Sequence, residues 1–201
     1  MKKTILLFTS IATLSLLTGC ASNKAGYIDS RGTETIVSLN QINIQDWNNA
    51  ADQMIASLLS SGVLERAPRQ PAVLAISRIV NNTQQRVDIA SLTKKIRVGL
   101  SRTGKVLTTT TMGIGGRVED PLAKDAADYA AFMNDKPAAS ATQMPDYSLS
   151  GKLLEDKVSA GRDRQTTYTF QLSLTAVASG LAVWEDEVQI TKAGRKSSVG
   201  W

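Results

Sequence analysis

Apolar side chains recur every three or four residues in three stretches of the chain, which predicts three amphipathic helices. The first begins at Asp46, which we expect to be its N-cap, and stops before Gly62. The second covers residues 89–103 behind Asp88, and the third begins at residues 120–121, an aspartate followed by proline. The apolar sides comprise Trp47, Ala50, Ala51, Met54, Ile55, Leu58 and Leu59 in the first helix, Ile89, Leu92, Ile96 and Leu100 in the second, and Leu122, Ala126, Tyr129, Ala130 and Met133 in the third.

Strands are predicted between and after these helices. Residues 72–80 are apolar on both parities, as in a central strand covered on both faces, and residues 105–111 predict a second strand. From Tyr147 onward apolar and polar residues alternate, which indicates antiparallel strands with one buried and one polar face. Turns at 159–165 and 179–180 divide this region into a three-strand meander. The pattern therefore predicts one α/β domain.

The N-terminus has the pattern of a secretory signal peptide. Lys2 and Lys3 precede an apolar stretch from Ile5 to Leu17, which is too short for a membrane-spanning helix. The sequence Leu-Thr-Gly-Cys ending at Cys20 resembles the lipobox of bacterial lipoproteins. That resemblance implies removal of residues 1–19 and acylation of Cys20; the alternative is an incidental thiol beside an ordinary cleavage site.

The residues around the predicted domain indicate how it is attached. Ala21 and Ser22 follow the cysteine, and the absence of aspartate there favours the outer membrane, periplasmic face, as the location. Residues 20–43 are polar and without periodicity, so we expect an acylated cysteine and a flexible tether, leading into a domain over 44–192. Residues 193–201 are basic and predict a flexible tail.

Composition excludes several classes of function. The 201 residues are 42% hydrophobic and 20% charged, with one cysteine and no histidine. Without histidine, the commonest general base and metal ligand are missing, so we expect no enzyme, no metal site and no cofactor. Removing Lys2 and Lys3 lowers the formal charge from +5 to +3, which gives no reason to expect a nucleic-acid partner.

Three local clusters have a chemical and an ordinary interpretation. The Gly-rich residues 113–116 lack the lysine of a phosphate-binding loop and are better explained as a connection. The acidic residues 185–187 are either a carboxylate site or a solvated strand face, and the second is favoured because Glu185 and Glu187 share a face opposite Asp186. A set of cations is either a docking patch or the solvent side of the second helix: Lys94, Lys95, Arg97, Arg102 and Lys105.

Several segments within residues 44–192 stand out together: Asp46-Trp47-Asn48, Val73-Leu74-Ala75-Ile76, Asn81-Asn82-Thr83, Asp88-Ile89, Asp146-Tyr147 and Val183-Trp184. This set of segments resembles the penicillin-binding-protein activator family of outer-membrane lipoproteins, the LpoB type. The resemblance implies a fold like the N-terminal domain of TolB, a mixed sheet with flanking helices. It also implies that the chain binds and allosterically activates a class A penicillin-binding protein in peptidoglycan synthesis.

The resemblance does not identify the residues that contact the partner, because the loops that would carry these contacts differ in this chain. We expect contacts from the polar strand face, the 159–165 turn and the 113–117 loop, with Arg117, Arg162, Arg164 and Trp201 as candidates. Trp47 is expected in the core instead. The tether is short and has no proline, unlike that of the enterobacterial activator, which favours an alternative: a scaffold lipoprotein of a secretion or flagellar apparatus. A peptidoglycan hydrolase is a third, minor class.

Overall fold

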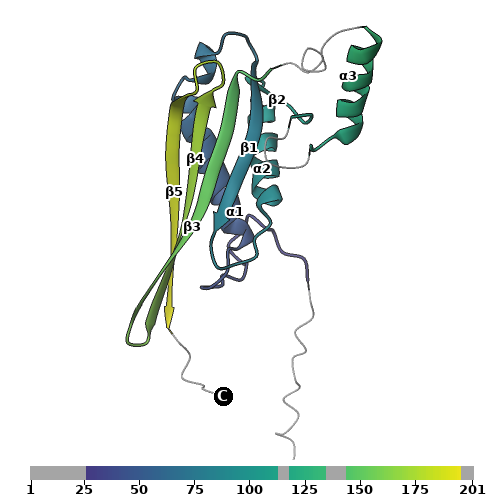
Figure 1. The fold of residues 1–201 in the computed structure, drawn as a ribbon. Coiled ribbons are helices and arrows are strands. Elements are labelled where there is room, and N and C mark those ends of the chain that lie inside the picture. Colours follow the sequence, from purple (N-terminus) through teal and green to yellow (C-terminus); the bar gives the residue numbers. More distant parts are fainter. Residues whose placement is uncertain (1–25, 113–117, 135–143, 196–201) are drawn as a thin grey trace, which may run out of the picture. The chain divides into compact units, whose positions relative to one another are not determined.

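The computed structural model describes residues 26–112, 118–134 and 144–195 (Figure 1). The chain divides into two compact units, one ending at Thr35 and one beginning at Ile36. Every helix and strand of the described residues lies in the second unit. In chain order they are α1 (Ile44–Ser60), η1 (Leu64–Arg66), β1 (Ala72–Asn82), α2 (Ile89–Arg102), β2 (Val106–Thr108), α3 (Pro121–Met133), β3 (Tyr147–Ala160), β4 (Asp163–Ala176) and β5 (Leu181–Arg195).

The strands form one mixed sheet in the order β2-β1-β3-β4-β5. β1 pairs in parallel with both β2 and β3, whereas β3, β4 and β5 form an antiparallel meander. Gly161 and Gly180 occupy the two tight turns with φ of 58° and 69°, a left-handed conformation that glycine adopts without steric cost. The predicted α/β class, mixed sheet and three-strand meander are confirmed.

Helices α1 and α2 pack on one face of the sheet and enclose the core (Figure 1). The prediction of Trp47 as a core residue is confirmed, since it is 7% exposed and its ring meets that of Phe170 edge-on at 5.6 Å. Each buried side chain of this size contributes about 1.5–3 kcal/mol. The sheet side of the core is formed mainly by alternate residues of the meander: Tyr147, Leu149, Leu153, Tyr168, Phe170, Leu172, Leu174 and Val188.

Two of the three predicted helix caps are correct. The carboxylates of Asp88 and Asp120 accept hydrogen bonds from Ala90 N–H and Ala123 N–H. The first helix, however, begins two residues before Asp46, and its N-cap is Asn43. Asp46 instead reaches back from the first turn and accepts the Asn43 N–H at 2.7 Å. The prediction failed because an aspartate at the start of an apolar helical pattern fits both positions: at the N-cap it accepts N–H groups of the first turn, and at the third helical residue it accepts the N–H of the N-cap residue.

The apolar side of α3 lies in solvent, contrary to the pattern of a helix packed by that side. Leu122, Tyr129, Phe132 and Met133 are 62–80% exposed, and the buried residue of the helix is the small Ala131. The start of α3 is held through the preceding segment, where Glu119 N–H and Asp120 N–H donate to the carbonyl of Thr110. Periodicity indicates that a helix has an apolar side, but it does not say what covers that side.

Both boundaries of the predicted domain need correction. Residues 36–43 belong to the second unit, with the helices and strands, and the carbonyls of Ser38 and Gln41 accept hydrogen bonds from Lys192 of β5. At the other end, β5 continues to Arg195, so residues 193–195 are strand and not tail. The signal peptide, Cys20 and residues 196–201 lie outside the described residues.

Candidate functional site

A buried lysine holds the chain where it enters the domain. Lys192 on β5 is 8% exposed and forms an ion pair of 2.5 Å with Asp46 on α1. Its ammonium also donates to the carbonyls of Ser38 and Gln41 and to Asn43 Oδ1. A buried cation needs this number of acceptors because it has lost its hydration. We call this arrangement the tether clasp.

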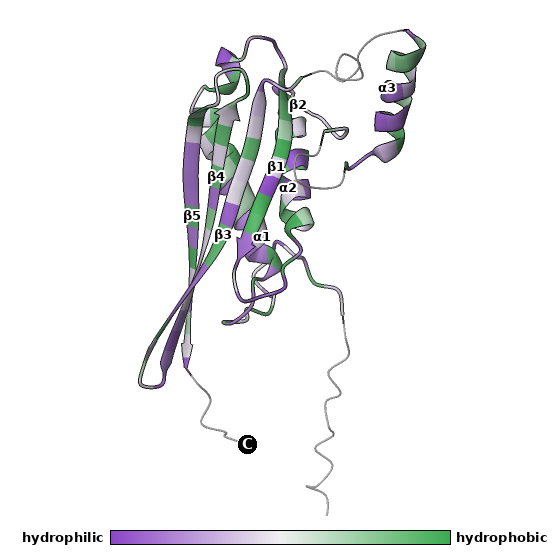
Figure 2. Ribbon diagram, in the orientation of Figure 1, coloured by the Kyte–Doolittle hydropathy of each residue, from purple (hydrophilic) through white to green (hydrophobic). Residues whose placement is uncertain are grey.

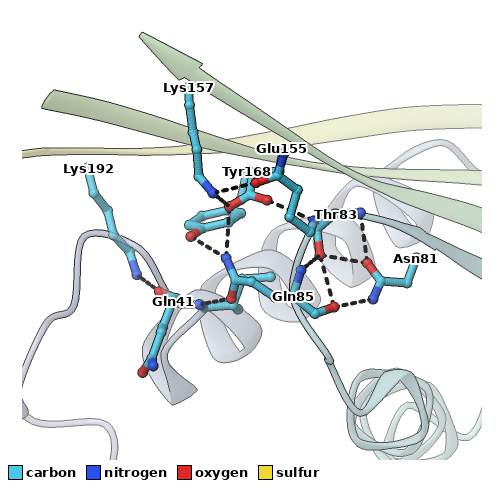
Figure 3. A network of polar contacts seen from close by, with 10 residues as sticks. Gln41, Asn81, Thr83, Gln85, Glu155, Lys157, Tyr168 and Lys192 are labelled. Carbon is cyan, nitrogen blue, oxygen red and sulfur yellow. Dashed lines mark hydrogen bonds and ion pairs between the residues drawn. The ribbon is translucent and has the colours of Figure 1, made fainter. Parts of the chain in front are cut away.

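A second polar network lies beside the clasp and is centred on Gln85 (Figure 3). The Gln85 amide donates to Glu155 Oε1 at 2.9 Å and to Tyr168 Oη at 2.7 Å, and it accepts Ile42 N–H at 3.1 Å. Glu155 is further paired with Lys157 at 2.9 Å. The network thus connects the loop before α2, strands β3 and β4, and the entering chain.

Burial and hydrogen bonding shift the pKa values of two groups in this network. For Glu155, burial acts to raise the pKa, but donation from Gln84 N–H, Lys157 and Gln85 outweighs it, so the pKa is lowered. Burial raises the pKa of Tyr168. Both groups therefore keep one protonation state at neutral pH, with Glu155 charged and Tyr168 protonated, as expected of a structural network.

The tip of the β3–β4 hairpin projects from the same end and is hydrophilic (Figure 2). All residues from 156 to 165 are exposed, including the candidates Arg162 and Arg164. Arg164 lines a shallow groove of about 580 Å³, which we call the tether-end groove, together with Lys157 and Arg195 of the sheet and Leu39 of the entering chain. Arg162 lies on the tip outside that groove. Arg117 and Trp201 fall outside the described residues.

The other surfaces named from the sequence are largely engaged in internal contacts. Glu185 and Glu187 on β5 accept hydrogen bonds from Ser173 and Gln171 of β4, which agrees with a solvated strand face. Four of the five cations assigned to the second helix region also have partners. Lys94 and Arg97 pair with Glu119, Lys95 donates to Asn48 and Lys105 pairs with Glu65.

A second groove, which the sequence did not indicate, opens at the opposite end of the sheet. This distal groove has a volume of about 530 Å³. Its walls are the chain around η1, the segment entering β3 and the β4–β5 turn. It is lined by Val63, Arg66, Pro68, Arg69, Met144, Pro145, Asp146, Tyr147, Ala176, Ala178 and Val183. These residues come from four separated segments of the chain, and no local sequence pattern in any one of them indicates a groove.

Two kinds of arrangement are absent from the described residues. Within the part of the chain that the structure describes, no group of acidic, cysteine or histidine side chains is placed to hold a metal ion. No helix of the same residues is long and apolar enough to cross a membrane. What the two grooves offer a ligand is apolar contact, hydrogen bonds and a few exposed cations.

Comparison with known proteins identifies a family that this chain matches. The sequence model of the family described as "Peptidoglycan-synthase activator LpoB" matches residues 46–190. Among curated proteins, none matches the chain. Among solved structures, the LpoB C-terminal domain from Escherichia coli is similar, with 18% identity and a TM-score of 0.46 over 72% of this chain and 98% of that one. The NMR structure of E. coli LpoB has 16% identity and a TM-score of 0.41 over 89% and 82%.

Proposed function

Since the chain belongs to the peptidoglycan-synthase activator LpoB family, we propose that it binds a class A penicillin-binding protein and activates it allosterically. The family match carries this proposal, because it extends from the first turn of α1 into β5 and so includes almost the whole domain. Activation requires only that the docked domain contact the active conformation of the synthase more favourably than the inactive one. The proposal therefore needs no catalytic residue and no cofactor in this chain.

The proposal includes a lipid anchor at Cys20 in the outer membrane, with the domain on the periplasmic side. It is supported by the lipobox-like sequence and by the polar residues that follow it. Residues 20–35 precede the compact unit, and sixteen extended residues reach about 55 Å at most. Stable anchoring takes two acyl chains or more, which a triacylated cysteine supplies.

Synthase activity with the purified components tests the function. Glycan polymerisation and crosslinking by a class A penicillin-binding protein from the same cells are measured with and without the acyl-free chain (residues 21–201). We expect both rates to rise and to saturate at a one-to-one ratio. Unchanged rates together with no binding would contradict the proposal. A stable oligomer in a size measurement, with no effect on the synthase, would instead support the scaffold alternative.

Metabolic labelling with radioactive palmitate tests the anchor separately. We expect the label in the wild-type chain and in the membrane fraction, and its loss in Cys20→Ala. The absence of label from the wild-type chain would remove the anchor from the proposal without affecting the activity measured on the acyl-free chain.

A further inference from the structure

We propose that the distal groove receives an extended segment of the synthase that carries apolar side chains next to a carboxylate. This inference rests on the proposed function, from which it takes the partner. The groove is lined by residues at the start of β3, the end of β4 and the start of β5, together with residues around η1. Its walls, its chemistry and its position in the molecule each support the assignment.

The walls of the groove are held in place by hydrogen bonds and an ion pair. Arg69 Nε pairs with Asp146 Oδ2 at 3.0 Å, and the same carboxylate oxygen accepts Val73 N–H at 2.7 Å. The buried hydroxyl of Tyr147 donates to the carbonyl of Val63 at 3.0 Å and ties β3 to the chain before η1. A groove that is already ordered loses less conformational entropy when a ligand binds.

The lining of the groove consists mostly of apolar residues, and exposed apolar side chains continue onto its rim. Val183 lines it at 36% exposure, Met144 at 55%, and next to them Leu181 on β5 is 65% exposed. Exposed apolar side chains that gather at one place mark interaction sites, whereas single ones do not. We therefore expect a ligand that buries apolar side chains and is larger than a small molecule.

An exposed arginine at the groove, Arg66, indicates that the ligand carries a negative charge. Arg66 is exposed, and its guanidinium makes no hydrogen bond or ion pair within the described residues. The neighbouring Arg69 already has Asp146 as partner. A carboxylate beside the apolar contacts would give Arg66 a partner, with the planar two-point geometry that arginine offers to carboxylates.

The position of the groove favours the synthase over a second copy of this chain. Along β3, ten residues separate Tyr147 in the distal groove from Lys157 in the tether-end groove, a distance of about 33 Å. The distal groove is thus at the end of the domain away from the point where the tether enters. Docking at this end adds the length of the domain to the reach of the proposed tether, which helps to contact a partner away from the anchoring membrane and is not needed to contact a second copy on the same membrane.

A charge reversal in the groove, with a matched control, tests the inference. In the acyl-free chain, Arg66→Glu combined with Val183→Glu is expected to weaken synthase binding at least tenfold and to reduce stimulation at equal concentration. The control is Arg86→Glu, an exposed arginine in the loop before α2 whose side chain also has no partner in the described residues; we expect binding within twofold of wild type. Equal binding of wild type and the double variant would overturn the inference while leaving the proposed function intact.

Crosslinking gives a readout that does not depend on how the variants fold. A photoreactive phenylalanine analogue at Val183 is expected to crosslink to the synthase, and the same analogue at Arg86 is not. Crosslinks at Val183 to another copy of the chain, or none to the synthase when wild type binds it, would overturn the groove as the docking site. Failure of the wild-type chain to bind any synthase would overturn both proposals together, and is distinguished by the wild-type measurement alone.

Discussion

The two ends of the sheet carry grooves of similar size that are lined by different types of residue. The tether-end groove, about 580 Å³, is lined mostly by polar and basic residues, and residues 39–40 of the entering chain form part of its wall. The distal groove, about 530 Å³, is mostly apolar, with Arg66 exposed beside it. Buried charges and hydrogen bonds hold the entering chain at one end, and the other end, with its exposed apolar side chains, is the one that we propose as the docking surface.

This difference also explains why cations are a poor guide to the interface. Lys192, Lys157 and Arg195 lie at the tether end, and each has an internal partner. The charges of these three side chains are used within the domain, whereas Arg164 in the same groove makes no hydrogen bond or ion pair with the described residues. The distal end carries fewer charges, but the guanidinium of Arg66 has no partner there among the described residues.

The largest expected effect comes from removing the clasp cation. Lys192→Met leaves the buried Asp46 carboxylate without its ion pair, and breaking a buried pair from one side costs about 3–5 kcal/mol. Urea denaturation of the acyl-free chain measures the loss. Arg195→Ala is the control, because its pair with Asp163 is solvent-exposed and we expect a loss below about 1 kcal/mol. If both variants lost a similarly small amount of unfolding free energy, the buried pair of Lys192 would stabilise the fold no more than the exposed pair of Arg195.

An intermediate effect is expected at Glu155, with a defined pH dependence. Because the pKa of this carboxyl is lowered in the folded protein, its contribution is present at neutral pH and is lost as the pH falls through the folded-state pKa. We expect Glu155→Gln to cost about 1–3 kcal/mol at pH 7. The difference from wild type should shrink progressively in urea titrations as the pH falls below the ordinary pKa of a glutamate side chain. A difference that stays constant with pH would show that the charge of Glu155 does not contribute.

The smallest expected effect is at the distal end. Tyr147→Phe removes the hydroxyl that donates to the Val63 carbonyl, at a cost of about 1 kcal/mol. Thermal unfolding measures this loss, which should remain well below that of Lys192→Met. If Tyr147→Phe were the more destabilising of the two, the distal end would be the principal anchor of the fold, and the assignment of tasks to the two ends would be reversed.

The hydrophobic pattern of the sequence determined most of the secondary structure. The three helices, the buried strand predicted over 72–80 and observed over 72–82, and the alternation from Tyr147 onward follow from local periodicity, which reports which side chains of one element share a side. The N-caps Asp88 and Asp120 could also be predicted, because an N-cap residue is adjacent in the chain to the helix that it caps. The meander could be predicted because consecutive strands joined by short turns usually pair with each other in antiparallel orientation.

Contacts between distant segments were decided only by the tertiary structure. The clasp joins Lys192 to Asn43 and Ser38, about 150 positions away, and nothing in the local pattern marks a lysine near the end of a strand as buried. The exposed side of α3 and the distal groove are further examples. Periodicity reports the shape of one element, whereas a groove or a buried ion pair exists only where several elements meet, and their meeting depends on how the whole chain packs.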